Sequence, residues 1–168
     1  MIVVSDTSPL NYLVLIGADQ VLPSLFGRVL TPPEVLAEMQ HAKAPLQVSA
    51  WAKNPPAWLE VRSPQQAPQF PGLGPGESAA IALAQQEHAA ALLIDERDGT
   101  AVARQLGLFV TSTLAILCLA SETGLLSLPA AFAALRQTTF RGPPKLMDEL
   151  LEIDAARLAA QAKPEGER

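Results

Sequence analysis

Short, wholly apolar runs that end in an oxygen-bearing side chain are the feature that most constrains the fold of this sequence. Three runs have this form: residues 2–4 ahead of Asp6, residues 91–94 ahead of Asp95, and residues 108–110 ahead of Thr111. Runs this short and this apolar are typical of strands that are buried on both faces of a parallel sheet. The carboxyl ends of such strands meet at one edge, so the polar side chains are expected to gather there.

Segments with helical patterning separate these strands. Residues 29–30 and 58–61 have the composition of two further strands. The predicted helices are residues 9–16, 19–26, a helix opened by residues 31–34, and then 44–53, 75–88, 96–106, 113–123, 129–137 and 145–161. Strands that alternate with helices predict an α/β protein, with a three-layer α/β/α domain around a short central parallel sheet of about four to five strands.

Several residues are expected to start or stop these helices. Thr31-Pro32-Pro33-Glu34 has the form of a capping box with proline at the first helical position. Asp19 is placed to cap the helix that follows it, and Gly17 and Gly27 are plausible helix stops.

Length and composition favour one globular domain. The chain has 168 residues, of which 49% are hydrophobic and 17% charged. This suits a single folded core and not a disordered chain. We expect one domain over residues 1–162 and a frayed tail at 163–168. The stretch 63–76, rich in proline and glycine, is interpreted as a loop inside that domain.

Charge and cysteine content narrow the class of protein. The formal net charge of −5 argues against a general nucleic-acid coat protein, because such proteins are basic. It is compatible with a nuclease whose carboxylates bind cations. Cys118 is the single cysteine, so an internal disulfide is excluded. With no export signal and no apolar run long enough to span a bilayer, we expect a cytoplasmic protein without a membrane partner.

Four carboxylates are candidates for one metal site. Asp6 and Asp95 follow strands, while Glu38 and Glu77 stand on helices that border the apolar core. Carboxylates gathered at one place repel each other and stay ionised only with a cation between them. Ligands that are all oxygen suit the hard cations Mg²⁺ and Mn²⁺.

Each of these acids also has a purely structural interpretation. Asp6 and Asp95 would serve as helix N-caps, Glu77 would complement a helix dipole, and Glu38 would be a solvated helix residue. Glu34 is assigned to the capping box. Asp98 is either an accessory metal ligand or a first-turn acid that complements the helix dipole.

The chain resembles the PIN domain family, specifically the VapC-like ribonuclease toxins and their DUF3368-type branch. Four segments in family order carry the resemblance: VVSDTSPLNYLVLIG, TPPEVLAEM, LGPGESAAIALA and LLIDERDGTAVARQLGLFVTSTLAIL. They cover residues 1 to about 126. Residue by residue, the resemblance matches the first to fourth family acids to Asp6, Glu38, Glu77 and Asp95, with Ser8 as the accompanying hydroxyl.

The resemblance implies a ribonuclease that depends on Mg²⁺ or Mn²⁺. Glu38 or Asp95 would accept a proton from the attacking water. Arg97 and Arg104, on one helix face, and the hydroxyls of Ser8 and Thr113 are candidate substrate contacts. RNA would be the substrate, and a cognate antitoxin protein would be a partner. The apolar faces of residues 9–16 and 113–120 serve either the core or a homodimer.

Two rival functions remain open at this stage. A non-catalytic module would keep the fold and bind RNA or an antitoxin without cutting. A metal-dependent phosphatase for small molecules would also begin with an aspartate after the first strand. Such sites need a second acid two residues later, where this chain has Ser8. A phosphate loop at residues 72–78 is excluded because Glu77 stands in the place of the required lysine. His41 and His88 have no apparent partners, which disfavours a metal-free ribonuclease that uses two histidines.

Overall fold

The computed structural model describes residues 1–66 and 69–163. The chain divides into two compact units, Met1–Thr113 and Leu114–Arg168. We describe each unit by itself. The single domain predicted for residues 1–162 stays a prediction, and residues 164–168 of the predicted tail lie outside the described part of the chain.

The first unit is built on a parallel sheet. Its strands are β1 (Ile2–Ser5), β2 (Arg28–Thr31), β3 (Leu59–Val61), β4 (Ala91–Leu93) and β5 (Val110–Thr111). They lie in the order β3-β2-β1-β4-β5, and every neighbouring pair is parallel. The predicted α/β class and the parallel sheet of four to five strands are therefore confirmed.

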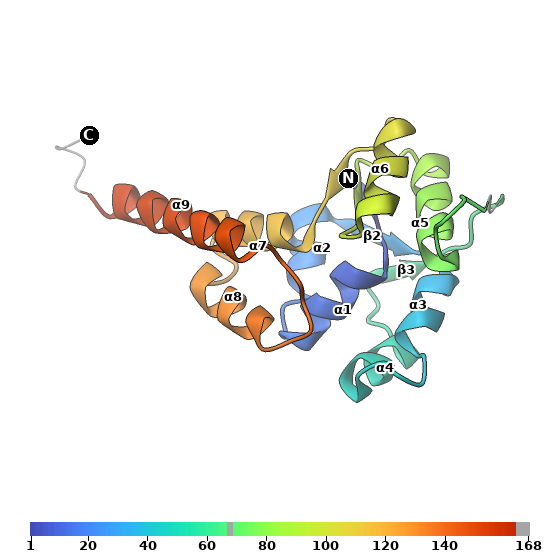
Figure 1. Ribbon diagram of the computed structural model, residues 1–168, viewed down its shortest axis with the longest axis horizontal. Coiled ribbons are helices and arrows are strands. Elements are labelled where there is room, and N and C mark those ends of the chain that lie inside the picture. The colour runs from blue at the N-terminus through green and yellow to red at the C-terminus, as the bar shows by residue number, and fades with distance from the viewer. Residues whose placement is uncertain (67–68, 164–168) are drawn as a thin grey trace. The chain divides into compact units, whose positions relative to one another are not determined.

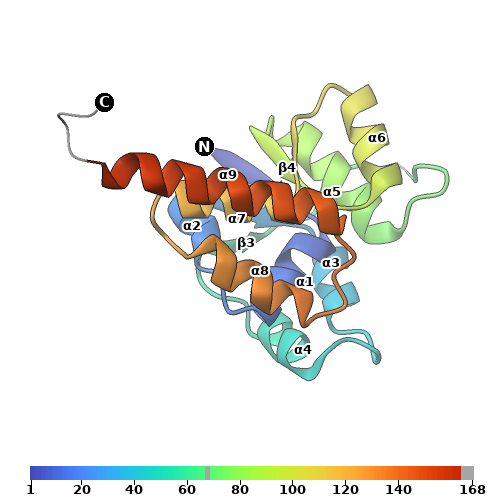
Figure 2. The same ribbon diagram turned by 60° about the vertical axis from the view of Figure 1, so that its left-hand side comes forward.

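The described residues of the first unit also form six helices (Figures 1 and 2). They are α1 (Thr7–Leu15), α2 (Val21–Phe26), α3 (Pro33–Met39), α4 (Leu46–Lys53), α5 (Pro75–Gln86) and α6 (Arg97–Gln105). Five of them lie around the sheet, and α4 lies beyond α1 and α3. Helix α5 packs against β1, β4, α3 and α6, while α4 packs against α1 and α3. Alanines dominate α5, and its residues 78–84 are all buried. Small side chains let this helix lie close to the sheet.

The core of the first unit joins the central strands to α5. Val4, Leu30 and Leu92 come from three neighbouring strands, and Ile81 and Leu83 come from the helix; all five are fully buried. Burying each such side chain contributes about 1.5–3 kcal/mol. The core thus fixes the positions from which β1, β4 and α5 present their polar ends.

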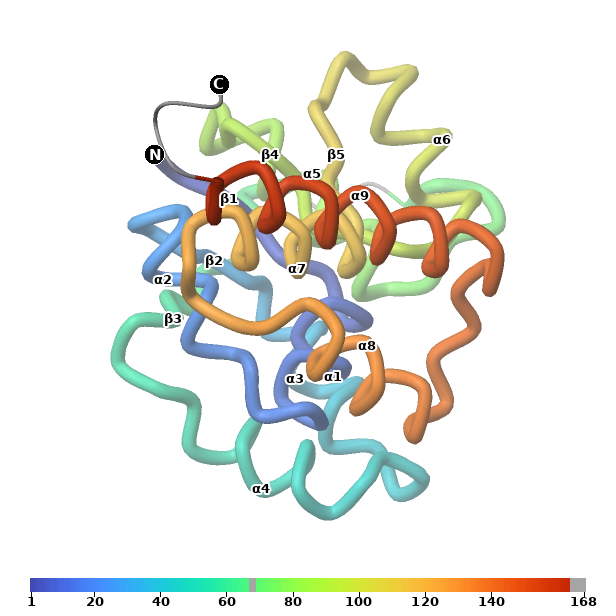
Figure 3. Tube along the Cα trace, turned by 90° about the vertical axis from the view of Figure 1, so that its left-hand side faces the viewer, coloured from blue at the N-terminus to red at the C-terminus, as the bar shows by residue number. Residues whose placement is uncertain are grey.

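The second unit forms three helices within the residues that the structure describes. Helix α7 (Thr113–Glu122) begins at the last residue of the first unit and leads to α8 (Leu128–Arg136) and α9 (Pro144–Ala162). Figure 3 shows α8 and α9 side by side, and the two helices are in contact. Ser121 on α7 donates a hydrogen bond of 2.7 Å to Asp154 on α9, which ties these two helices together.

Some predicted boundaries were wrong. Helix α1 begins at Thr7, two residues before Pro9, because Pro9 tolerates a place in the first turn. The last strand is Val110–Thr111 and not residues 108–110, since Val110 and Thr111 are the residues in register with Leu92 and Leu93 of β4.

Two predicted helix caps were also wrong. Pro33 does occupy the first position of α3, but Pro32 is the N-cap and no side chain caps the helix. The Thr31 hydroxyl instead donates to the Ser5 carbonyl across the sheet, at 2.9 Å. The N-cap of α2 is Gln20, and the Asp19 carboxylate accepts a hydrogen bond from the Trp51 indole. In both places the side chain makes a tertiary hydrogen bond and does not cap the local helix.

The helices that the structure describes include none that is long and apolar enough to cross a membrane.

Candidate active site and metal centre

The site lies where the sheet changes its direction of winding. From β1 the chain moves outward to β2 and β3, then returns to β4 on the other side of β1. The carboxyl ends of β1 and β4 therefore flank the switch point, which is where open parallel sheets bind ligands. In the β1–β4 register, Ser5 stands opposite Leu93, so Asp6 leaves β1 beside Ile94.

Asp6 is a buried carboxylate that lacks a full set of partners. Only 1% of the residue is exposed. Its backbone N–H donates to the Leu93 carbonyl at 2.9 Å, which holds it at the sheet edge. Oδ1 is buried without a hydrogen-bond partner in the described structure. Burial raises the pKa of Asp6 well above its ordinary value, the Thr7 backbone N–H opposes this, and the charges of three glutamates add to it. These are Glu96, Glu77 and Glu38.

Glu77 approaches from the first turn of α5. The N-cap of this helix is Gly74, whose backbone N–H hydrogen-bonds Glu77 as in half of a capping box. Oε2 is buried and unpartnered among the described residues. Burial raises the pKa of Glu77, and the charge of Glu96 raises it further. A Cβ at Gly99 would lie 2.5 Å from Glu77 Oε2, so glycine at this position leaves room for the carboxylate.

Glu38 reaches the same place from α3. Its Oε2 accepts a hydrogen bond from the Thr7 hydroxyl at 2.5 Å, and its Oε1 accepts from the Gly76 backbone N–H at 2.9 Å. A Cβ at Gly76 would lie 2.5 Å from Glu38 Oε1. The absent side chain therefore admits Glu38 to the N-terminus of α5.

Asp95 makes its hydrogen bonds with Thr113. Its two oxygens accept hydrogen bonds from Thr113, at 2.8 Å from the backbone nitrogen and 2.7 Å from the hydroxyl. Burial raises the pKa of Asp95, while both Thr113 bonds lower it and Glu96 raises it. Asp95 thus joins the end of β4 to the start of α7. The predicted catalytic role of Asp95, and the substrate contact predicted for Thr113, stay predictions.

Glu96 is a member of the cluster that the sequence reasoning missed. It is exposed, it is the N-cap of α6, and it accepts a hydrogen bond from the Ser8 hydroxyl. Its charge is the one that most strongly raises the pKa of both Asp6 and Glu77. Successive residues of an extended segment point to opposite sides. On this pattern Glu96 shares a side with Ile94, the residue beside Asp6, whereas Asp95 lies on the other side and accepts hydrogen bonds from Thr113. This period of two was the pattern that would have found it.

The remaining predicted residues lie around α6. Asp98 is exposed in the first turn, and its charge raises the pKa of Glu77, which brings it to the border of the cluster. Arg97 and Arg104 are exposed on the same helix. Their contacts with a substrate stay predictions.

The acids lie in one cluster but are not arranged as a complete set of metal ligands. Among residues 1–66 and 69–163, no three acidic, histidine or cysteine side chains are arranged so that they would hold a metal ion as they stand. The hydroxyls of Thr7 and Ser8 hold Glu38 and Glu96. Asp6 Oδ1 and Glu77 Oε2 are left as the buried, open oxygens of the cluster.

A parallel α/β sheet with carboxylates gathered at its switch point defines a protein of nuclease-like fold. The chain belongs to the PIN domain family: the family described as DUF3368: PIN domain matches residues 2–155. Among solved structures it is similar to a PilT N-terminus domain protein, SSO1118, from the hyperthermophilic archaeon Sulfolobus solfataricus P2. The identity is 13% and the TM-score 0.48, over 84% of this chain and 100% of that chain. No curated protein matches the chain.

Proposed function

We propose that this protein is a ribonuclease dependent on Mg²⁺ or Mn²⁺, with Asp6, Glu38, Glu77 and Glu96 at its active site. The carrying observation is the pair of buried, unpartnered oxygens, Asp6 Oδ1 and Glu77 Oε2. An ionised carboxylate buried without a partner is costly, and the cost is removed when a cation binds. PIN domains are in general metal-dependent nucleases, so the family supports the same conclusion.

The donor set fits a hard divalent cation. All donors are carboxylate oxygens, which Mg²⁺ and Mn²⁺ prefer over nitrogen or sulfur. Asp6 and Glu77 would supply the buried ligands. Glu38 and Glu96 would complete the set, with the hydroxyls of Thr7 and Ser8 still bound to them.

Each residue then has a defined task. When bound, a divalent cation supplies Lewis-acid activation of a water and charge neutralisation at a phosphodiester. Thr7 and Ser8 orient Glu38 and Glu96 through their hydroxyls. Glu38 is exposed and accepts a proton from the attacking water. Asp95 acts as a positioning residue that fixes β4 against Thr113.

The test compares isosteric amide variants on mixed RNA, first in EDTA and then in Mg²⁺ or Mn²⁺. Asp6→Asn and Glu96→Gln should each reduce metal-dependent cleavage by about 100-fold or more, because removing even an outer-shell partner costs about 10–100-fold. Asp95→Asn is the matched control. It should act through stability, with near-normal turnover per folded molecule. Cleavage that persists in EDTA, or survives in Asp6→Asn, would sink the proposal.

Asp95→Asn also decides between the two possible fourth acids. A loss equal to that of Asp6→Asn, in a variant whose thermal unfolding is unchanged, would return the role to Asp95. No cleavage by folded, metal-loaded wild-type protein that is free of any antitoxin would favour a non-catalytic binding module.

We further propose that the protein is the toxin of a toxin–antitoxin pair. The support is the family resemblance. A small reading frame beside the gene, whose product suppresses the ribonuclease and binds this chain, is the expected finding. If expression of the active protein does not slow growth, or if the neighbouring product does not bind, this part of the proposal fails.

A further inference from the structure

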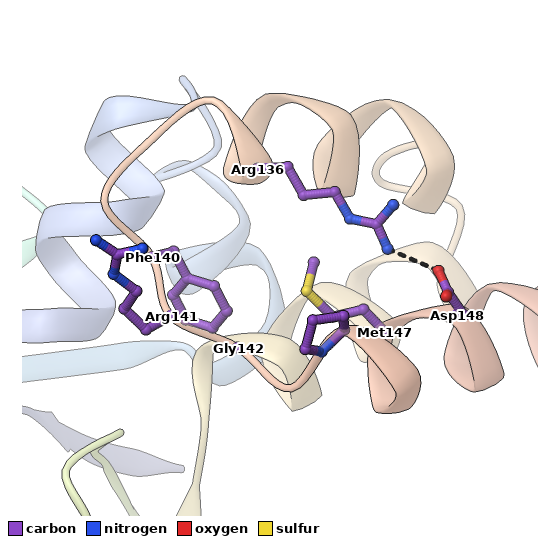
Figure 4. Close-up of a pocket in the computed structure, with 7 residues that line it drawn as sticks. Arg136, Phe140, Arg141, Gly142, Met147 and Asp148 are labelled. Atoms are coloured by element: carbon purple, nitrogen blue, oxygen red, sulfur yellow. Dashed lines mark hydrogen bonds and ion pairs between the residues drawn. The ribbon is translucent and has the colours of Figure 1, made fainter.

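The second unit contains a cavity that the catalytic proposal does not use. It has a volume of about 500 Å³ and is lined by residues between the end of α8 and the first turns of α9. The lining residues that matter are Arg136, Phe140, Arg141, Met147 and Asp148. Figure 4 shows these side chains. This volume lies in the range of pockets that bind small organic ligands, which begins at about 300 Å³.

One wall of the cavity is apolar and closely built. Phe140 and Met147 supply a ring and a thioether. Gly142 leaves room for both side chains. A Cβ there would overlap the Phe140 ring and lie 3.2 Å from Met147 Sδ. Gly142 is therefore required by the approach of the ring and not by its backbone conformation. Met147 is only 3% exposed, so the half-buried Phe140 ring is the part of this wall that suits the flat face of a nucleobase.

The polar side of the cavity is basic. Arg136 is neutralised by Asp148 through an ion pair of 2.9 Å, drawn as a dashed line in Figure 4. Arg141 is exposed and has no ionic or hydrogen-bonding partner within residues 1–66 and 69–163. Lys145 follows nearby and is also exposed. Residues 136–148 thus hold three basic side chains and one acidic one, in a chain whose net charge is −5.

The start of α9 adds to this preference for an anion. Its N-cap is Pro143, and no side chain caps the 19-residue helix. Its first free backbone N–H groups belong to Lys145 and Leu146, next to the cavity-lining Pro144. Uncapped N–H groups and the helix dipole favour a phosphate, and here they supplement Arg141.

We propose that this cavity binds one nucleotide of a single-stranded RNA, with the phosphate on Arg141 and the base against Phe140. The choice of RNA rests on the proposed ribonuclease function. Single-stranded RNA is favoured because a base must leave its stack to reach an aromatic wall. The acidic cluster of the first unit repels RNA when no metal is present, so binding in EDTA depends on basic sites of this kind.

The experiment measures binding of a fluorescently labelled, mixed-sequence RNA oligonucleotide to the full chain in EDTA, over a range of salt concentrations. Arg141→Ala should weaken binding about tenfold and lower the slope of log K against log salt by about 0.7, the value for one phosphate contact on a single strand. Phe140→Leu should weaken binding about tenfold with an unchanged slope, since stacking releases no counterions. Thermal unfolding of each variant verifies that it is folded.

Lys53→Ala is the matched control. Lys53 is an exposed basic residue on α4, in the first unit. Its loss removes one positive charge. It should change the affinity by less than about twofold and leave the slope of log K against log salt unchanged. Equal loss in Lys53→Ala and Arg141→Ala would show general charge attraction and overturn the proposal. A glutamate-rich peptide that competes as well as RNA would overturn the nucleotide assignment.

Failure here is distinguishable from failure of the catalytic proposal. Wild-type affinity in both Arg141→Ala and Phe140→Leu would remove the nucleotide site, while metal-dependent cleavage that is lost in Asp6→Asn would still stand. The reverse outcome, with specific losses of affinity but no cleavage by wild-type protein, would leave the pocket as an RNA-binding site on a non-catalytic chain.

Discussion

Two aspartates, one in each unit, are buried almost completely and have opposite properties. Asp6 is 1% exposed and Asp154 is 5% exposed. Burial raises the pKa of Asp6, whereas the Arg157 guanidinium, followed by the Ser121 hydroxyl, lowers the pKa of Asp154. Burial alone therefore does not determine how an acid behaves. The difference lies in the partners that surround each carboxylate.

Asp154 has the partners of a structural acid. Its Oδ1 accepts hydrogen bonds from Ser121 at 2.7 Å and from Arg157 at 2.8 Å, which links α7 to α9. The charges that shift the pKa of Asp6 are those of other acids, Glu96, Glu77 and Glu38. A carboxylate surrounded by acids destabilises the metal-free fold. Such an arrangement is expected where a cation or a reaction requires it.

The largest predicted effect is on the Asp154 network. Arg157→Ala leaves Asp154 buried with Ser121 as its remaining partner, so the free energy of unfolding should fall by about 3 kcal/mol. Urea denaturation followed by circular dichroism measures the change. Arg136→Ala is the control, because the Arg136–Asp148 pair is exposed and its loss should cost less than about 1 kcal/mol. Equal losses would mean that Asp154 is not a buried structural acid.

In EDTA, Asp6→Asn should raise the free energy of unfolding, whereas Arg157→Ala should lower it. Asp6→Asn removes a buried charge that lacks a partner, so the variant should be more stable than the wild type by about 2 kcal/mol. Asp154→Asn serves as the matched substitution and should be less stable, because an amide pairs poorly with Arg157. The comparison between the two aspartates breaks down if both substitutions shift the unfolding midpoint in the same direction.

A bound divalent cation should offset the loss of stability that Asp6 causes. It should not change the contribution of Asp154 to stability. At a Mn²⁺ or Mg²⁺ concentration ten times the dissociation constant, the wild-type protein should gain about 1.4 kcal/mol of stability. Thermal unfolding with and without the ion measures this gain. Asp154→Asn should keep the full increment and Asp6→Asn should lose it. An increment that survives in Asp6→Asn would place the cation elsewhere in the chain.

The fold was predictable from the sequence because the runs that form the central strands β1 and β4 are short and apolar. Residues 2–4 and 91–94 have no polar side chain that would fit another environment, and glycine and proline mark the helix ends around them. The start of α1 and the last strand were misplaced by two residues. The Thr31 capping box was wrong because its hydroxyl found a carbonyl on a neighbouring strand. Local patterns do not contain such tertiary contacts.

The site was predictable only in part. Asp6, Glu38 and Glu77 were selected from their places at the ends of strands and on helices, and the structure brings them together. Glu96 was missed because Asp95, the residue directly after the strand, was chosen in its place. The alternation of side chains along the chain favours the next residue, Glu96. The Thr113 bonds that engage Asp95 join residues 18 apart in sequence. No spacing rule predicts that partner.

The smallest predicted effect is the dependence of stability on pH, and it tests the comparison most directly. The pKa of Asp154 is lower in the folded chain than in the unfolded chain. Its stabilising contribution is therefore present above the unfolded pKa of roughly 4 and is lost as pH falls through the folded value. The pKa of Asp6 is higher in the folded chain. Its contribution is present below roughly pH 4 and is lost as pH rises through the folded value.

Unfolding measured in EDTA from pH 3 upward separates the two. The stability gap between wild type and Asp154→Asn should shrink on acidification. The advantage of Asp6→Asn over wild type should grow as pH rises. Each slope is limited to about 1.4 kcal/mol per pH unit, the value for one proton. Parallel slopes would show that the two carboxylates have the same surroundings in solution, and the assignment of Asp6 to a cation site would lose its physical basis.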